Sequence, residues 1–210
     1  AIMLGEGNPK RRIDVILKES LPSALRHPTF FAVGGGWRTF AKAQMAAAGA
    51  AVPVVHGYRI TAAEARAFAK SILKMSPAKL AALPGVPRRR VRTLPAAAMM
   101  LDRVLKHLAP EHVVFSALGL REGWIYSQLE TDERYLDPLI EGAQLVGLPP
   151  ARVPDFAAAL VPWTAGLNTD ETTNDKRLRI ALCALSDIGW RDHADIRAEE
   201  SYRRILQFPF

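Results

Sequence analysis

One short stretch near the start of the chain limits what it can fold into. Residues 30–33 are apolar, residues 34–36 are three consecutive glycines, and a helical apolar pattern begins at Phe40. This order is typical of a β-strand, a tight turn and the N-terminus of a helix. Glycines let the backbone approach a phosphate without Cβ clashes, and the free N–H groups of a helix N-terminus attract it. The stretch therefore predicts an α/β unit with a turn that can hold an anion.

Packing alone also explains these glycines. Gly34, Gly35 and Gly36 lack the G-x-G-x-x-G spacing, and no acidic residue follows about 20 positions later. No Lys-Ser/Thr pair completes a phosphate loop either. Both nucleotide-loop motifs fail, so a structural turn that packs the helix against the strand is the alternative.

Composition restricts the partners and the compartment. The 210 residues include 28 Lys+Arg and 21 Asp+Glu, a net charge of +7, which favours nucleic acid, an anionic membrane or a phosphate-rich small molecule. The single cysteine, Cys183, excludes an intramolecular disulfide and a cysteine-based zinc site, as expected in a reducing cytoplasm. No apolar run reaches the roughly 18 residues that a membrane span needs.

Periodicity predicts alternating strands and helices first and helices alone later. Before residue 130 we expect a polar turn at 8–12, an amphipathic helix to Leu25, a strand before the glycines and a helix to Gly49, an extended segment at 52–60, helices beginning at Thr61, Ser76 and Leu94, a strand at 112–116 and a helix from 120. After it we expect helices near 134–147, 154–164, 174–189 and 195–207. The predicted domains are 1–128, α/β, and 129–210, all α.

The basic excess is concentrated in one part of the chain. Between Arg59 and Arg121 there are 12 Lys/Arg and 3 Asp/Glu, a local charge of +9. Adjacent guanidinium groups such as those of Arg88, Arg89 and Arg90 repel one another unless an anion is near, and they suit phosphate. The alternative is a solvated helix face. No aromatic residues interleave with this run, so a specific nucleic acid is not expected.

Several short motifs occur in the order found in one enzyme family. They are residues 32–38 (AVGGGWR), 56–60 (HGYRI), 83–86 (LPGV) with Arg90 and 93–95 (TLP), and 115–123 (FSALGLREG). Together they resemble the exopolyphosphatase/guanosine pentaphosphate phosphohydrolase (Ppx/GppA) family, and the LREG box at 120–123 is the most specific of them.

The resemblance implies a fold and a reaction. The fold would be an actin-like, ribonuclease-H-like phosphatase of two α/β lobes, with this chain containing the later part of the second lobe. The reaction would be Mg²⁺-assisted hydrolysis of terminal phosphoanhydrides in inorganic polyphosphate or pppGpp. A homodimer is a further expectation for the partners, and the cytoplasm is the expected location.

The comparison also shows what the chain lacks. The family's Asp-x-Gly-Ser-Asn phosphate loop, its water-activating acidic residue and its second glycine-rich loop have no counterpart here. We therefore expect a C-terminal fragment with no catalytic residue of its own, whose Mg²⁺ ligands lie upstream. The predicted phosphate-binding residues are Gly34, Gly35, Gly36, Trp37, Arg38, Arg88, Arg89, Arg90 and Arg121. The alternative function is a non-catalytic polyanion-binding or interaction module.

The helical part extends the resemblance. Residues 182–190, followed by His193, resemble the degenerate HD-type helical domain that follows the phosphatase lobes in some family members. A working HD site places His directly before Asp because both bind one divalent metal. Here Ser186 precedes Asp187, so we expect no metal site in this domain, which is also expected to be truncated. His56 is expected to be a hydrogen-bonded scaffold residue.

Overall fold

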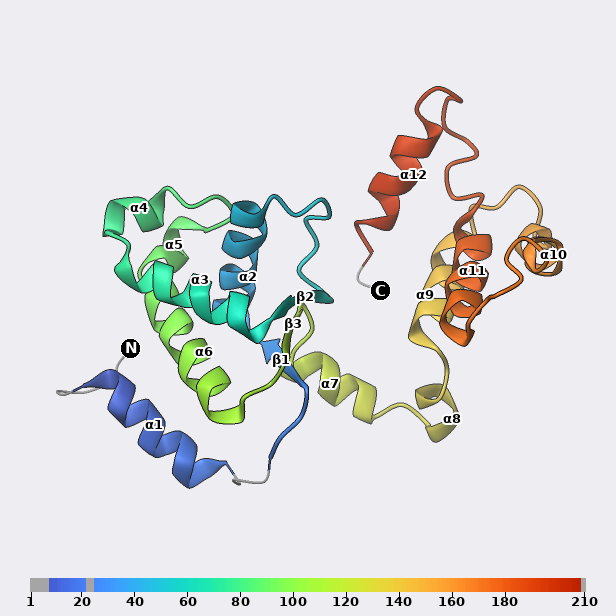
Figure 1. Ribbon diagram of the computed structural model, residues 1–210. Helices are drawn as coiled ribbons and strands as arrows, with labels where there is room; N and C mark the ends of the chain where they lie inside the picture. The colour runs from blue at the N-terminus through green and yellow to red at the C-terminus, as the bar shows by residue number, and fades with distance from the viewer. Residues whose placement is uncertain (1–7, 22–24, 209–210) are drawn as a thin grey trace. The chain divides into compact units, whose positions relative to one another are not determined.

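The protein has a mixed α/β fold that divides into two compact units. This computed structural model describes residues 8–21 and 25–208 (Figure 1). The first unit ends at Ile125 and the second begins at Tyr126. Among the described residues, no helix is long and apolar enough to cross a membrane.

The described sheet of the first unit has three strands in the order β1-β3-β2. Strand β1 (Thr29–Val33) runs parallel to β3 (His112–Ser116), and β2 (Tyr58–Thr61) runs antiparallel to β3. Strands β1 and β3 match the prediction, but the extended segment expected over 52–60 becomes a strand only from Tyr58. Pro53 has no N–H for a ladder, and Gly57 turns the chain with φ of 76°.

Seven of the described helices begin in the first unit. They are α1 (Pro9–Ser20), α2 (Gly35–Ala48), α3 (Ala62–Lys74), α4 (Pro77–Ala81), α5 (Arg88–Val91), α6 (Leu94–Leu108) and α7 (Leu120–Ser127). The capping box expected at Thr61 is present, because its hydroxyl accepts from the Glu64 N–H while the Glu64 carboxylate accepts from the Thr61 N–H.

The polar turn expected at 8–12 is wrong. The helix already begins at Pro9, because the Asn8 side-chain oxygen accepts from the N–H groups of Lys10 and Arg11. An Asn cap followed by Pro at the first helical position starts a helix well, since Pro lacks only an N–H that would stay unbonded there.

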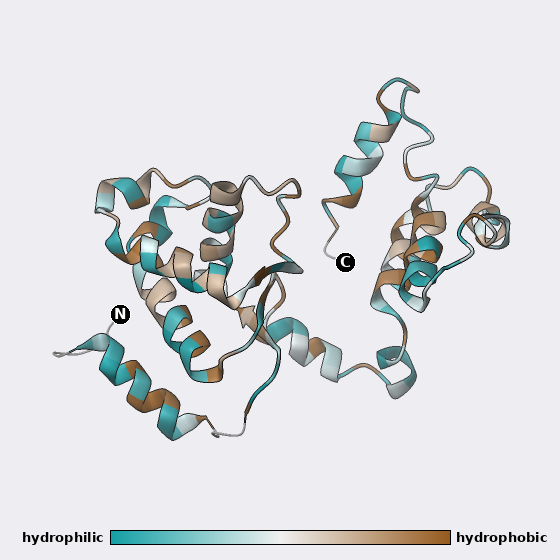
Figure 2. Ribbon diagram, in the orientation of Figure 1, coloured by the Kyte–Doolittle hydropathy of each residue, from teal (hydrophilic) through white to brown (hydrophobic). Residues whose placement is uncertain are grey.

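The core of the first unit lies between the sheet and its helices. Helix α6 lies against α1, α2 and α3, and Phe40 of α2 stacks on Phe115 of β3 with ring centroids 6.0 Å apart. Phe40, Phe115 and Leu101 are fully buried, each contributing about 2–3 kcal/mol by leaving water. Figure 2 shows apolar and hydrophilic residues alternating along these helices. This core holds the N-terminus of α2 in place beside α6.

The second unit is built from helices. They are α8 (Thr131–Arg134), α9 (Pro138–Gly147), α10 (Phe156–Thr164), α11 (Thr173–Leu185) and α12 (Arg197–Ile205). No strand occurs among its described residues 126–208, as predicted. The helix expected over 174–189 ends at Leu185, where the Ser186 hydroxyl donates to the Cys183 carbonyl and competes with a further helical turn.

The buried core of the second unit is small. It consists of Ala143, Ala181, Ala184, Leu185 and Ile188. Helices α9 and α11 approach so closely that a Cβ on Gly147 would lie 2.0 Å from the Ala184 carbonyl oxygen. The absence of a side chain at this position is therefore a condition for the packing of the two helices.

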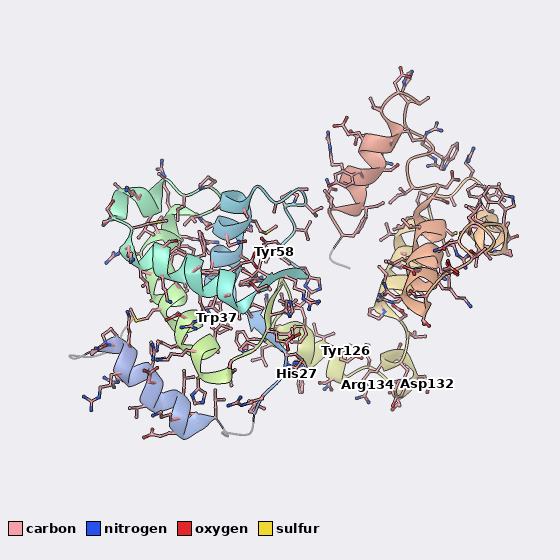
Figure 3. All side chains as sticks on the ribbon, in the orientation of Figure 1. His27, Trp37, Tyr58, Tyr126, Asp132 and Arg134 are labelled. Carbon is pink, nitrogen blue, oxygen red and sulfur yellow. The ribbon has the colours of Figure 1, made fainter. Side chains whose placement is uncertain are left out.

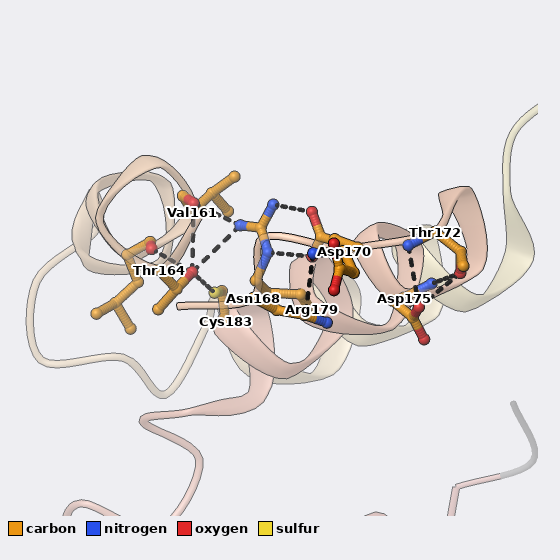
Figure 4. A network of polar contacts seen from close by, with 10 residues as sticks. Val161, Thr164, Asn168, Asp170, Thr172, Asp175, Arg179 and Cys183 are labelled. Atoms are coloured by element: carbon orange, nitrogen blue, oxygen red, sulfur yellow. Dashed lines mark hydrogen bonds and ion pairs between the residues drawn. The ribbon is translucent and has the colours of Figure 1, made fainter. Parts of the chain in front are cut away.

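Polar contacts supplement this small core (Figure 4). The Arg179 guanidinium donates to both carboxylate oxygens of Glu171, at 2.6 and 2.9 Å, and to the Val161 carbonyl at 2.5 Å. It also donates to the Thr164 hydroxyl at 3.2 Å. One partly buried arginine thereby ties α10 and the segment before α11 to α11 itself.

Candidate phosphate-binding site

Two turns lie side by side at one edge of the sheet. Because β1 and β3 are parallel and Val33 pairs with Ser116, both strands end at the same edge. The glycine turn (Gly34, Gly35 and Gly36) follows β1, and residues 117–119 follow β3. A Cβ on Gly119 would lie 3.8 Å from Cγ1 of Val33. Ligands commonly bind beyond the carboxyl ends of parallel strands, so this edge is the candidate site.

The glycine turn opens α2 without a side-chain cap. Gly34 is the N-cap residue with φ of 122°, a conformation that favours glycine. A Cβ on Gly36 would meet the Ala97 Cβ at 3.1 Å, so this glycine lets α2 pack closely on α6. The packing role considered from the sequence therefore belongs to Gly36, whereas Gly34 provides the backbone conformation of the turn.

Arg90 is the arginine that reaches this turn. Its Nη2 lies 2.9 Å from the position that a Cβ on Gly35 would take, and its side chain is partly buried. No hydrogen bond or ion pair joins its guanidinium to another residue in the described ranges 8–21 and 25–208. A helix N-terminus already carries partial positive charge, so a second cation there is unfavourable unless an anion binds between them.

The other predicted arginines are placed differently. Arg88 and Arg89 lie exposed on α5, directly before Arg90 in the sequence. Arg121 is exposed on α7, where its Nη2 lies 3.7 Å from the Glu122 carboxylate. The structure thus brings Arg90 into contact with the glycine turn and leaves Arg88, Arg89 and Arg121 in solvent.

Trp37 packs against the scaffold. Its indole N–H donates to the Ala97 carbonyl at 3.1 Å, and its ring meets Phe30 edge to face with the ring centroids 5.6 Å apart. Figure 3 labels Trp37 among the side chains of the first unit. The tryptophan therefore fixes the first turn of α2 to α6 and to β1. This contact, like the one at Gly36, attaches the glycine turn to α6.

Arg38 connects the two turns. Its Nη1 donates to the Ala117 carbonyl at 2.9 Å, and Nδ1 of His56 lies 3.3 Å from the Ala117 N–H. This hydrogen bond is consistent with the scaffold role expected of His56. Ala117 itself was not among the predicted site residues, since an alanine peptide carries no sequence signal for such a role.

Glu122 was also not predicted as a site residue. Its carboxylate accepts from the Gly119 N–H at 2.7 Å. Hydrogen bonds from the backbone N–H groups of Glu122 and Gly119, aided by the charges of Arg121 and Arg38, hold the pKa of this carboxyl below its ordinary value. The ionised Glu122 therefore closes the N-terminus of α7, while that of α2 stays open.

Comparison with known proteins decides the family. The model of the Ppx/GppA phosphatase family matches residues 6–132, and the model of the exopolyphosphatase C-terminal region matches residues 139–208. The chain belongs to the Ppx/GppA phosphatase family. The resemblance seen in its motifs is thereby confirmed.

The solved structures that are similar to this chain include one of a member of the family. It is the crystal structure of the Aquifex aeolicus member of the Ppx/GppA protein family, with 18% sequence identity and a TM-score of 0.47. The similarity covers 65% of this chain and 46% of that one, so this Ppx/GppA chain spans less than half the length of that relative. No curated protein matches the chain.

The described carboxylates of this Ppx/GppA chain are not grouped as Mg²⁺ binding would require. Among the described residues, no three His, Cys, Asp or Glu side chains gather where they could hold a metal ion. Glu122, which lies at the candidate site, is already bonded to Gly119. Asp187 in the second unit is buried and accepts from the Arg152 N–H at 2.9 Å and from its guanidinium at 3.1 Å.

The Asp187–Arg152 pair makes the second unit sensitive to acid. Burial opposes ionisation of Asp187, but the hydrogen bonds and charge of Arg152 outweigh it and hold the pKa of the carboxyl below its ordinary value. The pair therefore stabilises the fold above the unfolded-state pKa of about 4, and this stabilisation is lost as the pH falls through the lower folded pKa.

We expect the unfolding midpoint of the second unit to fall more steeply below about pH 4 in the wild type than in Asp187→Asn. Thermal unfolding followed at several pH values checks this difference. Asp137 and Glu171 also have lowered pKa values because of hydrogen bonds from Arg177 and Arg179, so only the difference between the two proteins reports on Asp187. Parallel curves for both would contradict the prediction.

Proposed function

We propose that this chain is part of a phosphohydrolase that releases the terminal phosphate of inorganic polyphosphate or pppGpp. Within that enzyme, the proposed role of this chain is to bind the phosphate groups of the substrate. Water would attack the terminal phosphorus, the bond to the bridging oxygen would break, and orthophosphate would leave. The proposal includes an actin-like second lobe for the first unit and a degenerate HD-like domain for the second.

One observation carries the proposal. The guanidinium of Arg90 lies against Gly35 at the uncapped N-terminus of α2, and no described residue supplies the anion that would neutralise both. A phosphate oxygen placed between them would accept from the guanidinium and from the backbone N–H groups of the turn. The turn is already ordered before binding, because Trp37 bonds to Ala97 and Gly36 packs closely on it. This order lowers the entropic cost of binding phosphate.

The distribution of charge supports a polyanionic substrate. Residues up to 125 carry 19 Lys/Arg and 7 Asp/Glu, a net charge of +12, whereas residues from 126 carry 9 and 14, a net charge of −5. The positive charge is therefore gathered in the unit that contains the glycine turn. Arg88 and Arg89, exposed next to Arg90, would attract further phosphates of a long chain at little desolvation cost.

The chemical step is assigned to another part of the enzyme. The described residues include no group of side chains suited to Mg²⁺, and the candidate site contains no carboxylate free to activate water. The proposal therefore places the metal ligands and the general base outside this chain. For this chain alone we expect binding of tripolyphosphate without hydrolysis.

Phosphate release and binding should be measured side by side, with Mg²⁺ present. We expect the 210-residue chain to bind tripolyphosphate but to release no phosphate above a buffer blank. A longer protein that includes an Asp-x-Gly-Ser-Asn box should release it. Hydrolysis by the 210-residue chain, abolished by a point substitution within it, would overturn this division of roles.

The alternative is a non-catalytic polyanion-binding module, because an Arg90 guanidinium with no partner among the described residues would bind phosphate in that case too. The two functions differ in the longer protein. Turnover there supports the phosphohydrolase, and binding without turnover supports the module. Failure of the 210-residue chain to bind tripolyphosphate would contradict both.

A further inference from the structure

The backbone N–H and carbonyl of Ala117 are each bonded to a side chain of another segment. Its N–H lies 3.3 Å from Nδ1 of His56, which belongs to the loop before β2. Its carbonyl accepts from Nη1 of Arg38, in the first turn of α2, at 2.9 Å. The backbone of this one residue therefore connects the end of β3 both to the loop before β2 and to the helix that the glycine turn opens.

The geometry defines which nitrogen of the His56 ring carries the proton. A backbone N–H can only donate, so Nδ1 must accept and the ring proton must be on Nε2. The Ser116 hydroxyl, 3.5 Å from the same Nδ1, does not compete because it donates to the Leu118 carbonyl at 3.1 Å. The neutral imidazole of His56 is thus a dedicated acceptor for the Ala117 N–H.

This contact lies directly beside the candidate site. Ser116 pairs with Val33 across the sheet, so Ala117 is the next residue beside Gly34. Gly119, two residues later, lies against the Val33 side chain. Whatever holds Ala117 therefore determines where the turn 117–119 and the guanidinium of Arg38 lie relative to the glycine turn.

We propose that His56 is a positioning residue for phosphate binding at the glycine turn. It holds Ala117 so that the Ala117 carbonyl in turn holds Arg38, which keeps that guanidinium oriented before the anion arrives. Without the acceptor, the Ala117 N–H loses its partner and the site has to be ordered during binding, which lowers affinity. The inference rests on the proposed phosphate-holding function and assigns a role within it.

Two substitutions distinguish the effect of the hydrogen-bond acceptor of His56 from the effect of its side-chain bulk. His56→Asn keeps an oxygen at a place similar to Nδ1, and His56→Leu keeps the bulk without an acceptor. His193→Leu is the matched control, because Nδ1 of His193 also lies 3.3 Å from a backbone N–H, that of Asp195, but in the second unit. We expect tripolyphosphate affinity to fall about fivefold in His56→Leu and to stay near the wild-type value in His56→Asn and His193→Leu.

Nuclear magnetic resonance of the wild-type chain tests the contact itself. We expect the His56 ring proton on Nε2 at neutral pH and slow hydrogen exchange at the Ala117 amide, with faster exchange in His56→Leu. A proton on Nδ1 would overturn the inference even if His56→Leu failed to fold, because the tautomer is read on the wild type.

Calorimetry with tripolyphosphate tests the phosphate site and the positioning role of His56 separately. If the wild type binds and His56→Leu binds equally well, the positioning role of His56 is wrong and the phosphate site remains. If the wild type does not bind, the phosphate-holding function is wrong and the role of His56 is lost with it.

Discussion

Gly147→Ala is expected to lower the unfolding free energy of the second unit by about 3 kcal/mol. The added Cβ would lie 2.0 Å from the Ala184 carbonyl oxygen and 2.7 Å from its carbonyl carbon. Both atoms belong to the backbone of α11, so no side-chain rotation relieves the clash and the helices α9 and α11 must separate. The small core of this unit leaves few other contacts to offset the loss.

Hydrogen exchange at the amides of α9 and α11 measures this effect in the second unit alone. We expect faster exchange there and unchanged exchange in α2, α3 and α6. Gly123→Ala in α7 is the matched control, because it too is a helical glycine but its Cβ would meet nothing within 4 Å. It should be neutral or stabilise α7 by up to about 1 kcal/mol. Equal stability of Gly147→Ala and the wild type would show that the close approach of the two helices is wrong.

Arg90→Ala is expected to weaken tripolyphosphate binding by about 10- to 100-fold. This corresponds to about 1.5–3 kcal/mol for a hydrogen bond with a charged partner. Arg88→Ala and Arg89→Ala serve as matched controls, since they remove the same charge from exposed positions in the same short helix. Each should cost less than Arg90→Ala and should mainly reduce the slope of affinity against salt concentration.

Gly35→Ala tests the same contact from the other side. The new Cβ would lie 2.9 Å from Nη2 of Arg90, a flexible side-chain end that can move away. We therefore expect a folded protein whose tripolyphosphate affinity falls toward that of Arg90→Ala, with little further loss in the double variant. Titrations at several salt concentrations measure both effects.

The arginine run also makes a prediction about chain length. Replacing Arg88, Arg89 and Arg90 together should weaken long polyphosphate more than tripolyphosphate, because only a long chain reaches the exposed pair as well as Arg90. If long and short chains bound the triple variant as tightly as the wild type at low salt, the run would be an ordinary solvated helix start.

Local sequence rules determined much of the secondary structure. The strand, glycine turn and helix at 29–48 follow from a change of apolar period interrupted by glycines, and α3 follows from the Thr61 capping box. These signals act between residues close in the chain, so they can be read without the fold. The helix boundaries that were predicted wrongly depend on weaker hydrogen bonds of single side chains near the helix ends. Asn8 and Pro9 start α1 early, and the Ser186 hydroxyl accompanies the early end of α11.

The sequence by itself also determined the family and the local positive charge, because both are carried by the order and composition of residues. Only the tertiary structure decided which of the adjacent arginines meets the glycine turn, and that His56 and Arg38 hold one alanine peptide. Arg90 is 55 positions from Gly35, and His56 is 61 from Ala117. No periodicity connects residues so far apart. Their contacts follow from the parallel pairing of β1 with β3 and the packing of α2 on α6, which bring separate segments to one edge of the sheet.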